Sequence, residues 1–267
     1  MERPAGRLVV CPTPIGNLED VTLRVLRALR EAAVVACEDT RHTRRLLDRH
    51  GIEARLVSFH EHNERRRARE LAERVAGGET VALVSDAGTP GVSDPGFVLV
   101  RECMARGLAV EVLPGPSAVV TAVVASGLPA DRWRYAGFLP RKEGELRAEL
   151  ERAADTLVAF ESPGRVARTL KVLADLDPER EVAVCRELTK VHEEVVRGTA
   201  RELAERFAKG ARGEIVLVVG PAAAGDASLA PALDAVAALV EAGARRRAAA
   251  KVVSGLTGIP ANRLYQG

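Results

Sequence analysis

The sequence predicts an α/β protein of two α/β domains, the first built on a mainly parallel sheet and the second on a mixed sheet, with a small helical tail. Apolar runs rich in Val, Leu and Ile recur along the 267 residues, and segments with apolar residues at three- and four-residue steps separate them. This alternation is typical of a sheet covered by helices on both faces. The composition, 47% hydrophobic and 28% charged, is that of a globular protein, and the length suits one large domain or two smaller ones.

The first half of the chain contains five predicted strands, at 8–11, 33–37, 56–59, 81–85 and 110–113. Helices are expected between them near 20–31, 40–50, 62–76 and 95–107, and a helix of small residues follows at 117–126. The predicted strands of the second half are 135–139, 157–160, 182–185, 194–197 and 215–219. Longer turns in the second half favour some antiparallel pairing there.

Proline and glycine residues at 114–116 and 127–129 indicate the junction between the domains. We expect an N-terminal domain over 1–116, a C-terminal α/β domain over 117–222 and a small basic tail over 230–267. A linker rich in Ala, Gly and Pro spans 220–228, and two short helices are expected at 231–242 and 244–256. The tail is too small to hold a core alone, so we expect it to dock on the main body or on a partner.

The composition also argues against several classes of protein. No apolar run reaches the roughly 18 residues of a membrane span, and the first residues lack the apolar core of a signal peptide. The four cysteines lie 26, 66 and 82 residues apart, without a Cys-x-x-Cys pair. This spacing argues against a disulfide framework and against a zinc site, and we expect no metal. Free cysteines are typical of proteins in the reducing cytosol, which is the location we expect.

Three of the first five predicted strands end in loops of Gly and Pro: PTPIGN at 12–17, SDAGTPGVSDPG at 85–96 and PGPSA at 114–118. Carboxyl ends of parallel strands share one edge of a sheet, so these loops should converge on a ligand. None contains Lys or Arg, and neither a dinucleotide fingerprint nor a P-loop is present, which favours a zwitterionic or cationic small molecule. A rigid turn explains the first loop, at 12–17, equally well. The second loop, at 85–96, has twelve constrained residues, which is more than a surface turn needs.

Residues 41–69 form a basic segment with nine arginines against four carboxylates, and it contains four of the five histidines. Because the whole chain carries only +2, the remainder is net negative. This asymmetry favours a polyanion such as RNA, and a solvated helix face is the alternative. His60 and His62 lack a second spaced pair, so we interpret them as polar loop residues near a site rather than as metal ligands.

Nine segments, in order, resemble the ribosomal RNA small subunit methyltransferase I family of the tetrapyrrole methylase superfamily. They are PTPIGNL at 12–18, CEDTR at 37–41, HEHNE at 60–64, the loops at 85–96 and 114–118, SGLP at 126–129, GFLPRK at 137–142, ESP at 161–163 and RELTK at 186–190. The similarity extends from about residue 8 to 220, and the basic tail resembles the family's helical tail. Two positions depart from the family pattern: Gly164 stands where His is common, which removes any role for a histidine there, and Cys185 replaces a common Ala.

The resemblance implies S-adenosylmethionine-dependent methylation of the ribose 2′-hydroxyl of a cytidine in the decoding region of 16S ribosomal RNA. It further implies a cytoplasmic homodimer that acts on 16S rRNA or the 30S subunit and not at a membrane. The cofactor would lie in the cleft between the domains. The cofactor-binding residues carried over are Pro14, Ile15, Gly16, Asp86, Gly88, Thr89, Ser117, Ala118, Phe160 and Leu188.

A ribose hydroxyl is a poor nucleophile, so a proton acceptor would assist its attack. By residue type and position the candidates are Glu38, Asp39, His60, His62, Glu187 and Lys190, and all six stay open. For Glu38 and Asp39 the structural alternative is pairing with Arg41. RNA contacts are expected from two arginine-rich groups and the tail, namely Arg41, Arg44, Arg45, Arg49, Arg65, Arg66, Arg245, Arg246 and Arg247.

The arginines at 41–49 follow Thr40, a candidate helix cap, and share roughly one helix face. Two other functions remain open. A tetrapyrrole methyltransferase of the same superfamily would not need the arginine-rich segment, and a non-catalytic RNA-binding protein would not need three converging loops.

Overall fold

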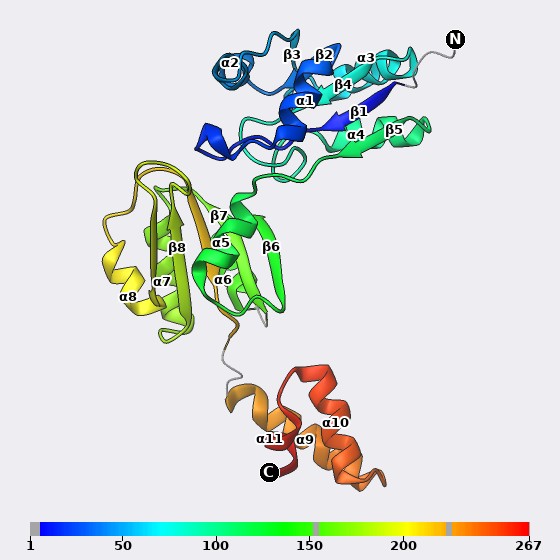
Figure 1. Ribbon diagram of the computed structural model, residues 1–267. Helices are drawn as coiled ribbons and strands as arrows, with labels where there is room; N and C mark the ends of the chain where they lie inside the picture. The colour runs from blue at the N-terminus through cyan, green and yellow to red at the C-terminus, as the bar shows by residue number, and fades with distance from the viewer. Residues whose placement is uncertain (1–5, 152–154, 223–225, 267) are drawn as a thin grey trace.

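The apolar runs of the first half pair as one parallel sheet in the order β3-β2-β4-β1-β5 (Figure 1). The strands are β1 (Arg7–Val10), β2 (Val34–Cys37), β3 (Leu56–Ser58), β4 (Thr80–Leu83) and β5 (Ala109–Val112). This computed structural model describes residues 6–151, 155–222 and 226–266. The three central strands are almost wholly buried, as continuous apolar runs require when helices cover both faces. The predicted parallel sheet is confirmed.

Helices cover both faces of this sheet. They are α1 (Leu23–Glu31) and α2 (Thr40–Arg49) on one face, and α3 (Glu64–Ala76) and α4 (Phe97–Ala105) on the other. The side-chain hydroxyl of Thr22 accepts the N–H of Val25 and starts α1. The expected cap at Thr40 is wrong: Asp39 is the N-cap of α2, because its carboxylate accepts the Arg41 N–H and leaves Thr40 as the first helical residue.

The second domain holds a mixed sheet in the order β6-β7-β10-β8-β9. Its strands are β6 (Trp133–Phe138), β7 (Thr156–Glu161), β8 (Glu181–Arg186), β9 (Glu194–Thr199) and β10 (Ile215–Val219). Only β6 and β7 pair in parallel, which confirms the expected antiparallel pairing elsewhere. The helix α5 (Ala118–Ser126) covers one face, and α6 (Glu143–Glu151), α7 (Val166–Leu176) and α8 (Ala200–Arg206) cover the other.

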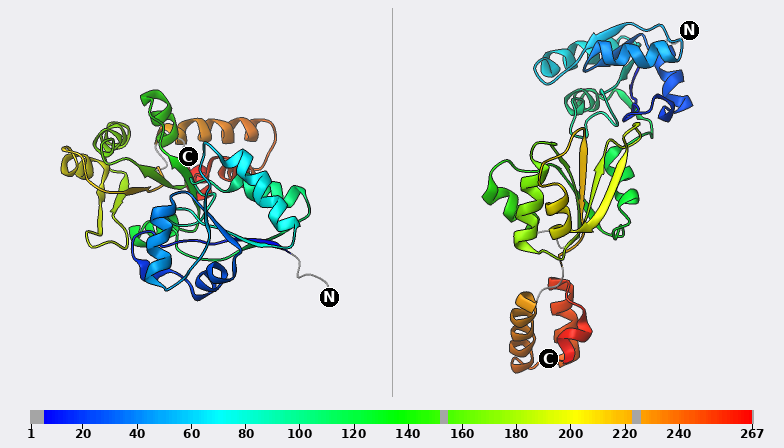
Figure 2. Two further views of the ribbon diagram at one scale, coloured as in Figure 1. Left: turned by 90° about the horizontal axis from the view of Figure 1, so that it is seen from above. Right: turned by 90° about the vertical axis from the view of Figure 1, so that its left-hand side faces the viewer.

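The C-terminal segment differs from expectation. It contains three helices, α9 (Asp226–Glu241), α10 (Arg246–Thr257) and α11 (Ala261–Gln266), instead of two. The expected start of α9 at Pro231 is wrong, because the helix begins at Asp226 and includes Pro231. The three helices share an apolar cluster of their own that includes Val236, Val253 and Leu264. The segment lies beyond the second domain and does not depend on it for a core (Figures 1 and 2).

The described parts of the chain contain no helix long and apolar enough to cross a membrane. All four cysteines are buried and free. Apolar clusters on both faces of each sheet hold the two domains together.

Candidate functional site

The Gly/Pro loops after β1, β4 and β5 meet, as the sequence predicts. Thr13 and Gly88 exchange both backbone N–H···O=C bonds, each 2.9 Å long. The Thr89 hydroxyl donates to the carbonyl of Pro116 at 3.4 Å, which joins the second loop to the third. Gly88 has a φ of +74°, a left-handed conformation that favours glycine. The convergence of the three loops is confirmed.

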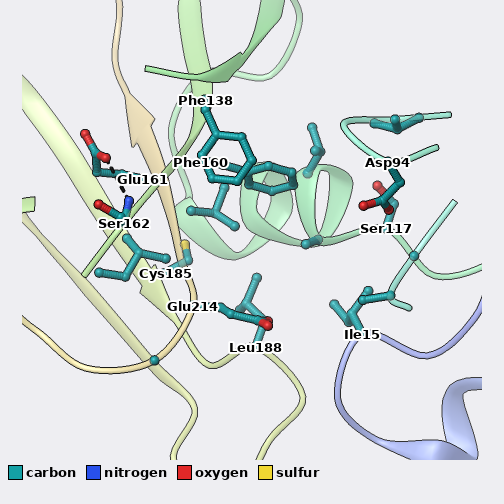
Figure 3. A pocket seen from close by; sticks show the side chains of 18 of the residues that line it. Ile15, Asp94, Ser117, Phe138, Phe160, Glu161, Ser162, Cys185, Leu188 and Glu214 are labelled. Carbon is teal, nitrogen blue, oxygen red and sulfur yellow. Dashed lines mark hydrogen bonds between the residues drawn. The ribbon is translucent and has the colours of Figure 1, made fainter. Parts of the chain in front are cut away.

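A cleft of about 350 Å³ lies between these loops and the second domain (Figure 3). The first domain and the start of α5 contribute Ile15, Ala87, Gly88, Thr89, Val92, Asp94, Ser117, Ala118 and Val119, and the second domain contributes Phe138, Phe160, Glu161, Ser162, Pro163, Cys185, Leu188 and residues 213–216. The rings of Phe138 and Phe160 have centroids 5.4 Å apart and form an aromatic wall. A volume of this size and a mainly apolar lining are typical of small-molecule sites.

Seven of the ten residues assigned to the cofactor line this cleft: Ile15, Gly88, Thr89, Ser117, Ala118, Phe160 and Leu188. The other three, Pro14, Gly16 and Asp86, are not in its lining. The Oδ1 atom of Asp86 instead accepts the backbone N–H of Asp39 at 3.0 Å, and so ties the loop after β4 to the end of β2. Gly16 lies at the domain boundary, where the neighbouring N–H of Asn17 donates to the Thr189 hydroxyl at 3.1 Å.

The cleft lining contains three carboxylates and, among the residues that the structure describes, no Lys, Arg or His. Glu161 is 2% exposed and accepts hydrogen bonds from the Ser162 N–H at 2.7 Å and from the Thr169 hydroxyl at 2.6 Å. Asp94 lies beside Ser117 (Figure 3), and burial first, then the charge of Glu38, raises its pKa to about 6. Asp94 belongs to the loop at 85–96, but its residue type and position in the sequence did not predict a role in the site.

Three of the six candidate proton acceptors are held in ion pairs. Asp39 lies 2.9 Å from the guanidinium of Arg41, whose hydrogen bonds hold the Asp39 pKa well below its usual range, so the pairing alternative is confirmed for Asp39. The N–H of Glu214, then the ammonium of Lys190, lower the pKa of Glu187. Desolvation acts to lower the pKa of Lys190, but hydrogen bonds from its ammonium to Glu214 and Glu187, both 2.9 Å, raise it overall. These three groups are poorly suited to accepting a proton.

The other three candidates lie near the carboxyl ends of β2 and β3. Burial, followed by the charge of Asp86, raises the pKa of Glu38. The Nε2 atom of His60 lies 3.1 Å from the amide nitrogen of Asn63, and its ring centroid is 5.9 Å from that of the exposed His62. Within the described ranges, no group of three or more His, Cys, Asp or Glu side chains is arranged to hold a metal ion.

The predicted RNA-binding arginines lie on three exposed surfaces. On α2, Arg44 and Arg45 have no ion pair within the described chain, whereas Arg49 approaches Glu19 at 3.7 Å. On α3, Arg65 and Arg66 border a groove with Arg69, Glu70 and Glu73. Arg245, Arg246 and Arg247 lie at the start of α10, at the opposite end of the molecule from α2 and α3 (Figures 1 and 2). A single chain therefore does not bring the tail arginines beside the other two groups.

Comparison with known proteins relates the whole chain to methyltransferases. The family model described as tetrapyrrole (corrin/porphyrin) methylases matches residues 7–204. A "Ribosomal RNA small subunit methyltransferase I" of Mesorhizobium japonicum is 50% identical over 223 residues, 81% of this chain and 76% of that protein. A protein of the same name from Micromonospora olivasterospora is 44% identical over 99% of this chain and 87% of its own length. Among solved structures, the methyltransferase CobJ matches 82% of this chain and 95% of its own, with a TM-score of 0.62 and 25% identity.

Proposed function

The chain belongs to the tetrapyrrole (corrin/porphyrin) methylase family, and from this premise we propose that it methylates 16S ribosomal RNA. The reaction is transfer of the methyl group of S-adenosylmethionine to the ribose 2′-hydroxyl of a cytidine in the decoding region. The observation that carries this proposal is the 44% identity, over 99% of the chain, with a protein named as a small-subunit ribosomal RNA methyltransferase. That similarity also extends over the basic tail.

The lining of the cleft fits S-adenosylmethionine. The aromatic wall of Phe138 and Phe160, with Ile15 and Leu188 opposite, suits an adenine ring. Hydroxyl and backbone groups of the Gly/Pro loops suit the ribose and the amino-acid end, and the absence of basic side chains from the described lining suits a cationic sulfonium. When bound, the cofactor would supply a methyl group that is already activated for transfer.

Positioning carries much of the proposed mechanism. The 2′-oxygen would attack the methyl carbon in line with the carbon–sulfur bond, which breaks as the new carbon–oxygen bond forms. Holding the two reacting atoms in this geometry replaces a bimolecular encounter and lowers the barrier substantially. The proton of the hydroxyl would pass to Glu38, which lies outside the cleft lining but follows β2 and acts through its charge on Asp94 of that lining. Its pKa is raised, whereas those of Asp39 and Glu187 are lowered.

The partners and location belong to the same proposal. Exposed arginines of α2, α3 and α10 would contact phosphates of 16S rRNA, either free or in the 30S subunit, in the bacterial cytoplasm. The working form would be a homodimer. Exposed apolar side chains support a second copy, namely Phe97 and Met104 of α4, Val112 of β5, and Val120 and Val124 of α5.

The proposal is tested by methyl transfer to purified 30S subunits and to free 16S rRNA, with a porphyrinoid acceptor in parallel. We expect tritium from labelled S-adenosylmethionine to enter one cytidine ribose of the decoding region, mapped by primer extension that is sensitive to ribose methylation. Transfer to the porphyrinoid alone would indicate a tetrapyrrole methyltransferase instead. Binding of RNA without binding of labelled cofactor would indicate a non-catalytic RNA-binding protein.

Replacing Asp86 by alanine is expected to weaken cofactor binding about tenfold or more, although the carboxylate does not line the cleft. Its hydrogen bond to the Asp39 N–H fixes the loop that leads to Gly88 and Thr89. Loss of a charge-assisted hydrogen bond costs about 1.5–3 kcal/mol, and about 1.4 kcal/mol corresponds to a tenfold change in affinity. Calorimetry with S-adenosylmethionine measures the effect, and an unchanged dissociation constant in a folded Asp86→Ala protein would refute it.

Replacing Gly16 by valine is expected to separate the two walls of the cleft and to raise the dissociation constant of the cofactor about tenfold. A tenfold change corresponds to a loss of about 1.4 kcal/mol of binding free energy. A Cβ atom at this position would lie 2.8 Å from the Thr189 hydroxyl and 3.1 Å from the carbonyl oxygen of Leu188. The turn that carries Leu188 must therefore move away from Ile15. Gly144→Val is the matched control, because no atom lies within 4 Å of a Cβ there. Equal cofactor affinities in the two variants would contradict this prediction.

A further inference from the structure

Asp94 is the carboxylate of the cleft lining that no basic side chain neutralises. The other two carboxylates of the lining are paired. Glu161 lies 3.4 Å from the guanidinium of Arg165, and Glu214 accepts a hydrogen bond from the ammonium of Lys190 at 2.9 Å. No ion pair among the described residues includes Asp94. The Ser85 hydroxyl donates a hydrogen bond to Asp94, which stabilises the ionised form but adds no positive charge. A carboxylate taken partly out of water without a counter-charge is unfavourable, and a bound cation would relieve that penalty.

The groups that face Asp94 add negative charge. Glu38 follows β2, Asp86 follows β4, and Glu214 precedes β10, and all three carboxylates act on Asp94. Tyr135 of β6 also faces it, as a phenol whose pKa burial raises, so it adds no positive charge. The cleft thus presents a negative potential at Asp94 that neutral ligands cannot use.

We propose that Asp94 recognises the positive charge of the sulfonium, so that the cleft selects S-adenosylmethionine over S-adenosylhomocysteine. The inference rests on the proposed use of S-adenosylmethionine as the methyl donor. Donor and product share the adenosine, amino and carboxylate groups and differ by one methyl group and by the charge on sulfur. Once the methyl group has left, the product lacks the positive charge that Asp94 recognises and binds less tightly. S-adenosylhomocysteine is therefore exchanged more readily for a new molecule of S-adenosylmethionine.

The experiment compares three ligands by calorimetry at pH 7.5: S-adenosylmethionine, S-adenosylhomocysteine and sinefungin, in which an ammonium group replaces the methylsulfonium. We expect the two cationic ligands to bind at least tenfold more tightly than the neutral-sulfur product. Asp94→Asn should bring all three within about threefold by weakening the cationic ligands alone. The matched control is Asp175→Asn, which removes a carboxylate of α7 that pairs with Lys171 outside the cleft and should preserve the preference.

A second measurement uses the unmodified protein and remains decisive if Asp94→Asn does not fold. The pKa of Asp94 is raised to about 6, mainly by burial. A bound cation favours the ionised form and lowers that pKa, so binding at pH 6 should release protons with S-adenosylmethionine and not with S-adenosylhomocysteine. Heats in buffers of different ionisation enthalpy report the release. Affinity for the cationic ligand should fall up to about tenfold between pH 7.5 and pH 5 as Asp94 becomes protonated.

The outcomes separate this inference from the proposed function. Equal affinities for donor and product in the unmodified protein would overturn the role of Asp94 while leaving the methyltransferase proposal intact. So would a preference that survives in Asp94→Asn, or a uniform loss of affinity for all three ligands in a folded variant. Failure of all three ligands to bind the unmodified protein would instead contradict the proposed cofactor, and the inference with it.

Discussion

Replacing Arg44, Arg45 and Arg49 together by glutamine should weaken binding to the 30S subunit about 10²-fold near 0.1 M salt. All three side chains are exposed on α2, and Arg44 and Arg45 form no ion pair within the described chain. Each arginine that contacts a phosphate releases a counterion, so its loss reduces the log–log salt slope by about one unit. The triple variant should therefore flatten the slope by about three units, and calorimetric affinity for the cofactor should stay unchanged because none of the three lines the cleft.

The control for this variant removes the same charge elsewhere. Arg27, Arg101 and Arg212 are exposed on other parts of the surface, and their joint replacement by glutamine lowers the net charge equally. We expect a smaller loss of subunit binding and a small change in slope. An unaltered slope in the α2 variant would show that this helix is a solvated face without phosphate contacts. A loss of cofactor affinity would show that α2 had been assigned to the wrong site.

Much of the fold follows from the local pattern of the sequence. Strands β1, β2 and β4 are buried on both faces, so they need continuous runs of Val, Leu and Ala that stand out without reference to the rest of the chain. The short helix α11 was missed because its six residues place only Leu264 in the core of the tail. The start of α9 was misplaced because proline is favoured in the first turn of a helix, whereas here it lies further in.

The sequence predicted that the three Gly/Pro loops meet, because parallel topology alone brings the carboxyl ends of strands to one edge. The roles of single side chains depended on contacts between distant segments. Asp86 was expected in the cofactor site, where it would either bind the cofactor or fix the loop. Its carboxylate accepts the N–H of Asp39, 47 residues away in the chain, and no local motif indicates that contact. Asp94 was missed because its raised pKa depends on burial and on Glu38 and Glu214, which no local motif reveals.

Replacing Glu38 by glutamine tests the proposed proton acceptor. Glu38 follows β2 directly, and burial, then the charge of Asp86, raises its pKa, which makes the carboxylate a stronger base than an exposed one. Glutamine keeps the size of the side chain but accepts no proton. Because general-base catalysis contributes about 10²–10⁴-fold, kcat for methylation of 30S subunits should fall at least about 10²-fold, while calorimetric cofactor affinity stays within about threefold.

The pH profile separates this role from a structural one. At saturating cofactor, kcat of the unmodified protein should rise with pH through the raised pKa of Glu38 and then level off, because only the ionised carboxylate accepts the proton. Glu38→Gln should lose this rise and retain a low, flat rate. Asp39→Asn is the control: asparagine can still cap α2 but lacks the charge that pairs with Arg41, so this variant should preserve the rise. A Glu38→Gln protein whose kcat stays near that of the unmodified chain, or whose rise with pH persists, would assign the proton to another group or to water.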